Sequence, residues 1–276
     1  LKAQETFALC ALAETAHLRA GGLKEPLAIA CNGPSSLRLE RILAPMKVQL
    51  HRAETGEANV LGLAAALRAK GLRVPLSGEG SNGGNITHPG TVRDPLMTLL
   101  SLVRFLYLPL REGKSAAEFY LDEIGARRTE GQTLLESVLA SFPIWHTTDA
   151  FDREALLPVP ALEHETLKQR YEDLLQAHFR KEREFWSGLG VEKLEFVNFE
   201  GSGSSAGPGG RQAPGRGGLS ARLLTRAGPR GFLWMRGSGT EPVFRVLADW
   251  GGTREDYQKL LDLHLELIGR ACRSRA

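Results

Sequence analysis

The sequence predicts an α/β domain with a mostly parallel mixed sheet, followed by a smaller α+β domain with an antiparallel sheet and two helices. In the first half, short apolar runs bounded by turn residues alternate with segments of helical period, the pattern of βαβ units. In the second half, hairpin-like pairs of alternating strands replace that order. The 276 residues suffice for two ordinary domains. We place these domains at residues 1–142 and 143–276.

The first half contains three short apolar runs that we predict to be strands. The run Leu27–Cys31, for example, lies between Pro26 and the turn residues Asn32-Gly33-Pro34. Asp94 before Pro95 favours a helix start, because Asp caps free amides and Pro suits the first helical position. The expected strands are 27–31, 48–51 and 72–77, and the expected helices are 6–20, 36–43, 59–70, 95–107, 115–125 and 133–142.

The second half has a different pattern. Residues 164–187 carry leucines and aromatics at helical spacing and predict one long helix. Residues 201–218 are rich in Gly, Ser and Pro, so we expect a flexible loop there. Thr253 and Asp256 form a capping box for a final helix that ends near Cys272. The expected strands are 146–150, 194–199, 221–225, 232–236 and 243–250.

The composition is that of an ordinary globular protein, with 42% hydrophobic and 24% charged residues. The formal net charge of +3 is too small to predict a nucleic-acid-binding protein. Cys10, Cys31 and Cys272 form no CxxC pair, which favours a reducing, cytoplasmic location. No apolar run approaches the ~20 residues of a membrane span. The chain starts at Leu1 inside a helical pattern, so we expect a fragment that lacks N-terminal domains.

The loop Gly78–Gly84, with the sequence GEGSNGG, follows a predicted strand and formally matches GxGxxG. A dinucleotide-binding loop would open directly into a helix, with an acidic residue about 20 positions later, and this context is absent. A plain turn that needs glycine is a second interpretation. The third is a ligand-binding loop whose glycines let the backbone approach the ligand. Glu79 accepts hydrogen bonds and Ser81 donates or accepts them, which suits sugar hydroxyls.

The segment Arg236–Pro242, with the sequence RGSGTEP, joins two predicted strands and is followed by Arg245. The hydroxyls of Ser238 and Thr240 and the backbone amides can donate to phosphate oxygens, and the two arginines add charge. This chemistry favours a phosphate-binding loop. A solvent-exposed hairpin loop with two incidental arginines is the alternative.

Three segments resemble motifs of the α-D-phosphohexomutase family, which includes phosphoglucomutases and phosphomannomutases. RGSGTEPVFRV resembles the family's phosphate-binding signature, and GEGSNGG resembles its sugar-binding loop. TGEANV, at residues 55–60, resembles the third-domain loop that faces the substrate. The three segments occur in the family's order and cover essentially the whole chain. The chain is therefore similar to the third and fourth domains of that four-domain family.

The resemblance implies roles for particular residues. Glu79 and Ser81 would bind the sugar hydroxyls. Asn82 beside them departs from the family pattern, in which a histidine commonly follows, and His88 further along is more often a structural loop histidine. Glu57 would lie near the catalytic centre, or else is a solvated loop acid. The residues that would hold the non-transferring phosphate are Arg236, Ser238, Gly239, Thr240 and Arg245.

The family's phosphoserine loop, T-A-S-H-N-P, and its metal-binding loop, D-G-D-G-D-R, do not occur in this sequence. We therefore expect no catalytic serine and no metal ligand in this chain, and no activity from the chain alone. The resemblance implies a parent isomerase that interconverts hexose 6-phosphate and hexose 1-phosphate, of glucose or mannose, through a phosphoserine. It also implies Mg²⁺ and a hexose 1,6-bisphosphate activator.

Two other functions remain as alternatives. One is a stand-alone phosphosugar-binding module without catalysis, for which the absence of the serine and metal motifs would be real. The other is nucleic-acid binding through Arg211 and Arg216 in the segment 201–218. That second alternative is disfavoured because the segment has no aromatic residue on which a base could stack.

Overall fold

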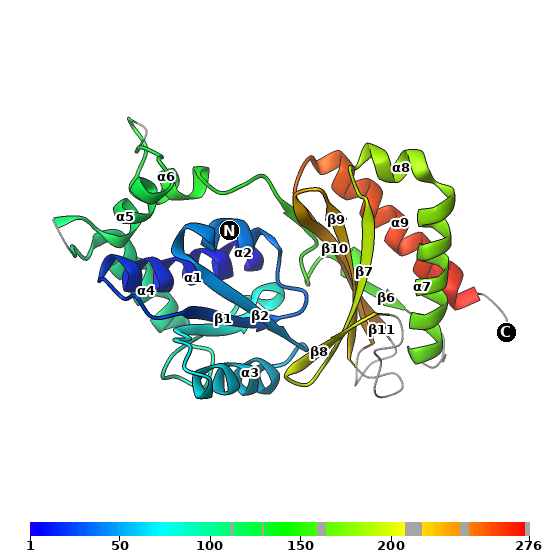
Figure 1. Cartoon of the computed structure of the whole chain (residues 1–276), viewed down its shortest axis with the longest axis horizontal. Coiled ribbons are helices and arrows are strands. Elements are labelled where there is room, and N and C mark those ends of the chain that lie inside the picture. Colours follow the sequence, from blue (N-terminus) through cyan, green and yellow to red (C-terminus); the bar gives the residue numbers. More distant parts are fainter. Residues whose placement is uncertain (111–112, 129, 159–163, 208–216, 238–242, 274–276) are drawn as a thin grey trace. The chain divides into compact units, whose positions relative to one another are not determined.

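The computed structural model describes residues 1–110, 113–128, 130–158, 164–207, 217–237 and 243–273 (Figure 1). The chain divides into two compact units. Unit 1 consists of Leu1–Arg52 and Gly56–Pro143, and unit 2 consists of Ala53–Thr55 and Ile144–Ala276. Each unit has its own sheet and its own hydrophobic core.

Unit 1 is built on a four-stranded mixed sheet with the order β2-β1-β3-β4. Strands β1 and β3 are parallel, with Ala30 opposite Ser77, whereas β3 and β4 are antiparallel. The carboxyl ends of β1 and β3 therefore meet at the same edge of the sheet. The strands are β1 (Leu27–Asn32), β2 (Val48–Ala53), β3 (Leu76–Glu79) and β4 (Gly84–Thr87).

Helices cover both faces of this sheet (Figure 1). Because side chains alternate along a strand, Ile29 and Cys31 pack in the larger core with α1, whereas Ala28 and Ala30 pack with α3. As predicted, the Asp94 carboxylate caps α4 by accepting from Leu96 N at 2.9 Å. The helices are α1 (Ala3–Ala20), α2 (Arg38–Leu43), α3 (Glu57–Ala69), α4 (Pro95–Tyr107), α5 (Ala116–Glu123) and α6 (Leu134–Ala140).

Part of the glycine-rich segment, expected to be a loop, is strand. Gly78 and Glu79 continue β3, where Glu79 lies opposite Gly84 of β4. A short 3-10 turn, Gly80–Asn82, and left-handed backbone at Gly83 (φ 68°) connect the two strands. The segment is therefore the tip of a hairpin, because glycine permits the positive φ that turns the chain back.

Unit 2 is built on an antiparallel sheet with the order β5-β11-β10-β9-β7-β8, and β6 also pairs with β11. The core lies between one face of the sheet and the helices, where Met235 and Val246 pack with Tyr171 and Leu267. The strands are β5 (His146–Thr147), β6 (Leu156–Pro158), β7 (Lys193–Glu200), β8 (Gly203–Ala206), β9 (Gly218–Thr225), β10 (Gly228–Gly237) and β11 (Val243–Trp250). The helices are α7 (His164–Lys181), α8 (Arg183–Gly188) and α9 (Arg254–Arg273).

These architectures confirm the predicted fold class, with two corrections in unit 2. The expected single helix over 164–187 is two helices, because the backbone leaves the helical region at Glu182 (φ −95°, ψ 58°). The expected loop over 201–218 is wrong at residues 203–206, which pair with β7 as strand β8. Residues 208–216 lie outside the described part of the chain. The Thr253 hydroxyl caps α9 by accepting from Asp256 N at 3.1 Å.

Among the residues that the structure describes, no helix is both long enough and apolar enough to cross a membrane.

Candidate functional site

Glu79 lies at the carboxyl end of β3, and its side chain is only 2% exposed. One carboxylate oxygen, Oε1, accepts from Gly56 N at 2.6 Å and from Asn32 Nδ2 at 3.4 Å. The other oxygen, Oε2, forms an ion pair with Arg93 Nη2. These donors balance the cost of burying a charged carboxylate and fix its orientation.

Ser81 belongs to the same group of side chains. Its Oγ accepts from Asn32 Nδ2 at 2.8 Å, and Asn32 Oδ1 accepts from Ser35 Oγ at 2.6 Å. Ser35 Oγ in turn accepts from Gly80 N at 3.1 Å. Asn32 ends β1 and Ser81 follows β3, so the parallel pairing of these strands brings the two side chains together. Asn82 is half-buried beside them.

Glu57 reaches this group through Arg93. The Arg93 guanidinium binds Glu57 Oε1 through Nε, at 2.5 Å, while its Nη2 binds the buried Glu79. Glu57 begins α3 and is 41% exposed. Arg93 lies between the end of β4 and the start of α4, and it is 40% exposed. Arg93 therefore links Glu57 and Glu79, the two predicted acidic residues of the site in unit 1.

The glycines of this hairpin are required by close packing. A Cβ on Gly78 would collide with the carbonyl oxygen of Gly84 on the paired strand. A Cβ on Gly80 would lie 2.6 Å from Gln4 Oε1 and 2.9 Å from Ser35 Oγ. A larger residue at Gly78 would displace the backbone that carries Glu79, whereas one at Gly80 would displace the Gln4 and Ser35 side chains.

In unit 2, Arg236 near the end of β10 lies opposite Arg245 on β11. Cross-strand partners point to the same face of a sheet. The adjacent pair, Met235 and Val246, belongs to the core under the helices, so the two arginines point to the opposite face. Along the chain, Arg236 precedes and Arg245 follows the segment 238–242. Ser238, Gly239 and Thr240 lie outside the described residues.

Glu54 is a buried partner of Arg236 that the sequence did not reveal. Its Oε1 lies 3.1 Å from Arg236 Nε and accepts from Thr55 N at 2.7 Å, while its Oε2 accepts from Gly218 N. Burial raises the pKa of the Glu54 carboxyl, against the opposing effects of Thr55 N, the Arg236 charge, Gly218 N and Lys168. The ion pair is made through Nε of the Arg236 guanidinium, so the side chain is held at the base of its planar group.

The structure thus brings Glu57, Glu79 and Ser81 together in unit 1, and Arg236 and Arg245 together in unit 2. Sequence reasoning missed Asn32, Arg93 and Glu54. Asn32 had a usable signal, because it ends a buried strand whose carboxyl end lies beside that of β3. Arg93 and Glu54 had none, since their partners are 14 and 182 positions away. His88 is exposed and follows β4, at the end of that strand away from Glu79.

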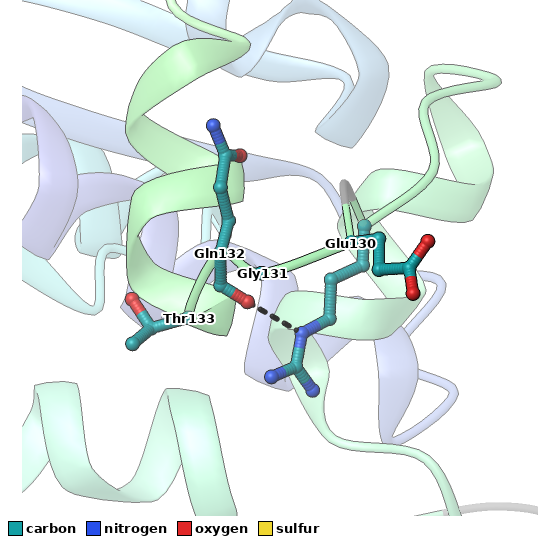
Figure 2. Close-up of a pocket in the computed structure, with 5 residues that line it drawn as sticks. Glu130, Gly131, Gln132 and Thr133 are labelled. Atoms are coloured by element: carbon teal, nitrogen blue, oxygen red, sulfur yellow. Dashed lines mark hydrogen bonds between the residues drawn. The ribbon is translucent and has the colours of Figure 1, made fainter.

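A shallow pocket of about 430 Å³ lies on the loop between α5 and α6 (Figure 2). Its lining includes Glu130 and Thr133, and Arg128 Nε donates to the Gln132 carbonyl oxygen at 2.9 Å. None of the predicted site residues lines it. No group of three or more His, Cys, Asp or Glu side chains in the described residues is arranged to hold a metal ion.

Comparisons with known proteins point to one family. Residues 3–125 match the family model of the phosphoglucomutase/phosphomannomutase α/β/α domain III. The crystal structure of a phosphoglucomutase/phosphomannomutase family protein from Burkholderia thailandensis is similar, with a TM-score of 0.51 at 17% identity over 99% of this chain. The N-acetylphosphoglucosamine mutase of Aspergillus fumigatus aligns with 98% of this chain at 14% identity and a TM-score of 0.42. A search of curated protein sequences gives no significant match.

The match over residues 3–125 covers the described sheet of unit 1 and the helices α1 to α5. Residues 3–125 are therefore similar to domain III of the phosphoglucomutase/phosphomannomutase family, and the likeness to the Burkholderia thailandensis structure over nearly the whole chain is one of fold. The chain spans 43% and 44% of the lengths of the two solved relatives.

Proposed function

We propose that this chain is the substrate-binding part of a phosphohexomutase that interconverts hexose 6-phosphate and hexose 1-phosphate of glucose or mannose. The observation that carries the proposal is the pair Arg236 and Arg245, which lie opposite each other on one face of the unit 2 sheet, Arg236 opening the RGSGTEP segment and Arg245 following it. The match of residues 3–125 to domain III of the phosphoglucomutase/phosphomannomutase family supports the same reaction class.

In unit 1, Glu79, Ser81 and Asn82 would bind sugar hydroxyls. The Glu79 carboxylate has about four lone-pair sites, so its three observed partners leave capacity for a ligand hydroxyl. The Ser81 hydroxyl accepts from Asn32, so its own hydrogen is available to a ligand oxygen. Glu57, 41% exposed, can accept a further hydrogen bond.

In unit 2, Arg236 and Arg245 would bind the phosphate that is not transferred, together with Ser238, Gly239 and Thr240 of the adjoining loop. Glu54 holds Arg236 by its Nε, which directs the planar guanidinium and restricts its rotamers. A preoriented guanidinium can bind two phosphate oxygens through its terminal amino groups.

Positioning and electrostatic stabilisation are the main protein contributions to phosphoryl transfer. We assign this chain the positioning of the hexose and of its distal phosphate. A hexose 1,6-bisphosphate activator would use the same groups, because it presents the same hydroxyls and a phosphate at either end. The described residues do not fit a Mg²⁺ site, so no step is assigned to the metal here.

Titration calorimetry with glucose 6-phosphate, mannose 6-phosphate and inorganic phosphate tests the proposal. Glu79→Gln removes the anionic acceptor but keeps the size of the side chain. We expect it to weaken hexose phosphate binding by about tenfold, with a smaller effect on inorganic phosphate. The chain alone should not interconvert the hexose phosphates. If the wild type and Glu79→Gln bind both hexose phosphates with equal affinity, Glu79 does not bind the sugar and this part of the proposal is wrong.

A further inference from the structure

A second pocket of unit 1 has cationic walls and no assigned role. It has a volume of about 510 Å³ and is lined by Arg68, Arg73, His88, Glu25 and the apolar side chains of Leu23 and Leu72, among others. Glu25 precedes β1, and Arg73 precedes β3. His88 follows β4, which is antiparallel to β3 with Thr87 opposite Leu76. The pocket therefore lies at the amino ends of β1 and β3, the opposite edge of the sheet from Glu79.

The two arginines are close neighbours without an acidic partner. Among the residues that the structure describes, neither Arg68 nor Arg73 forms a salt bridge, and the side chain of Arg73 is exposed at the pocket. Burial, and then the charge of Arg73, lower the pKa of Arg68. Burial and the charges of both arginines lower the pKa of His88. The two guanidinium charges thus both make the electrostatic potential of the pocket more positive.

A purely structural role accounts for only part of this arrangement. Arg68 Nη2 donates to the Val74 carbonyl oxygen at 2.8 Å, which holds the segment between α3 and β3. That contact explains the Arg68 side chain, whereas Arg73 pairs through its backbone with Pro26 and Ala28, and its side chain makes no hydrogen bond within the part of the chain that the structure describes. Like charges placed together cost free energy, so an unpaired arginine beside Arg68 is best explained by an anionic ligand.

We propose that this pocket binds the phosphate group of a small molecule, at a site separate from the Glu79 hairpin. Arg68 and Arg73 bind the phosphate oxygens. Glu25 cannot contact the phosphate favourably, but it can accept a hydrogen bond from a hydroxyl elsewhere on the ligand. Leu23 and Leu72 offer an apolar wall. The neutral imidazole of His88 can donate one hydrogen bond. The inference does not depend on the function proposed above, because it uses none of the same residues.

Nuclear magnetic resonance of the whole chain tests the site directly. Inorganic phosphate and glucose 6-phosphate are titrated separately, with sodium chloride of matched ionic strength as the reference. We expect saturable shifts of the backbone amides of residues 71–74 and of His88 with either phosphate compound. Tighter binding of glucose 6-phosphate identifies a phosphate ester as the ligand class, and equal binding identifies free phosphate.

Arg73→Gln should weaken binding at these amides by about tenfold, the loss expected for one charge-assisted hydrogen bond. Because Arg73 is exposed, this variant keeps the fold. Arg127→Gln, an exposed arginine elsewhere in unit 1, is the matched control and should bind like the wild type. The absence of saturable shifts, or equal affinity in Arg73→Gln and the wild type, overturns the proposal.

Discussion

His264 on α9 is a buried side chain of unit 2 whose two ring nitrogens both have hydrogen-bond partners. Its Nε2 lies 2.8 Å from the Trp234 carbonyl oxygen, and its Nδ1 lies 2.7 Å from the Tyr171 hydroxyl. A carbonyl can only accept, so Nε2 carries the hydrogen and Nδ1 accepts from Tyr171. Burial lowers the pKa of His264 to about 4, against the hydrogen bond to Trp234, which favours the charged form.

This depressed pKa predicts a loss of stability in acid. The unfolded chain binds a proton near pH 6.5, whereas folded unit 2 binds it near pH 4. The neutral His264 therefore contributes about 3 kcal/mol to the free energy of unfolding above about pH 6.5. This contribution is lost progressively as the pH falls from 6.5 to about 4. His264→Gln should remove that part of the pH dependence. Tryptophan fluorescence reports unit 2 alone, since Trp145, Trp186, Trp234 and Trp250 all lie there. Parallel pH profiles for the two proteins would refute the assignment.

Residue identities were only partly predictable from the sequence. Glu79 and Ser81 stood out because they lie among glycines after an apolar run. Arg93 and Glu54 lie in segments with no such signal, and their importance comes from partners that only the folded chain brings near. A buried ion pair requires both charges, so each missed residue holds a predicted residue in position.

At the level of elements, the β3–β4 hairpin depends on a glycine at position 78, where the two strands pack too closely for a side chain. A Cβ on Gly78 meets the Gly84 carbonyl of the paired strand, which is backbone and cannot move aside as a side chain could. Gly78→Ala should therefore destabilise unit 1 by about 2–3 kcal/mol. Gly188→Ala is the control, because its Cβ would meet nothing within 4 Å and alanine favours helix α8. Denaturant unfolding followed by circular dichroism compares them. Equal stability of Gly78→Ala and the wild type would contradict this packing.

Strands with a clear apolar pattern, continuous or alternating, were the most predictable elements, and those without one were the least. The run Leu27–Cys31 is strand β1, because every residue in it is buried. Strands β4 (GNIT) and β8 (GSSA) are short and rich in small or polar residues, so they show no hydrophobic pattern. They form because a neighbouring strand supplies the hydrogen bonds. The break between α7 and α8 was equally hidden, since Glu182 is an ordinary helix former.

At the level of the whole chain, the order of an α/β unit followed by an antiparallel α+β unit was predictable. Alternation of strands and helices demands parallel pairing, and closely spaced strands favour hairpins. The family match over residues 3–125 agrees with the α/β prediction for the first unit, because it identifies the α/β/α domain III of phosphoglucomutases and phosphomannomutases. That unit 1 binds the sugar and unit 2 binds the phosphate remains a prediction.

The most direct test of the account is a titration of the whole chain with glucose 6-phosphate, read at the backbone amides of β10 and β11. We compare the wild type with Arg236→Ala, and with Arg226→Ala as a matched control. Arg226 is 92% exposed and its ion pair in the described part of the chain is a surface contact with Glu192, so its loss should change little. Arg236→Ala should weaken binding by about tenfold or more, because it removes a guanidinium from the phosphate site. Equal affinity of the wild type and Arg236→Ala would show that Arg236 serves only its ion pair with Glu54, and that the phosphate site is wrong.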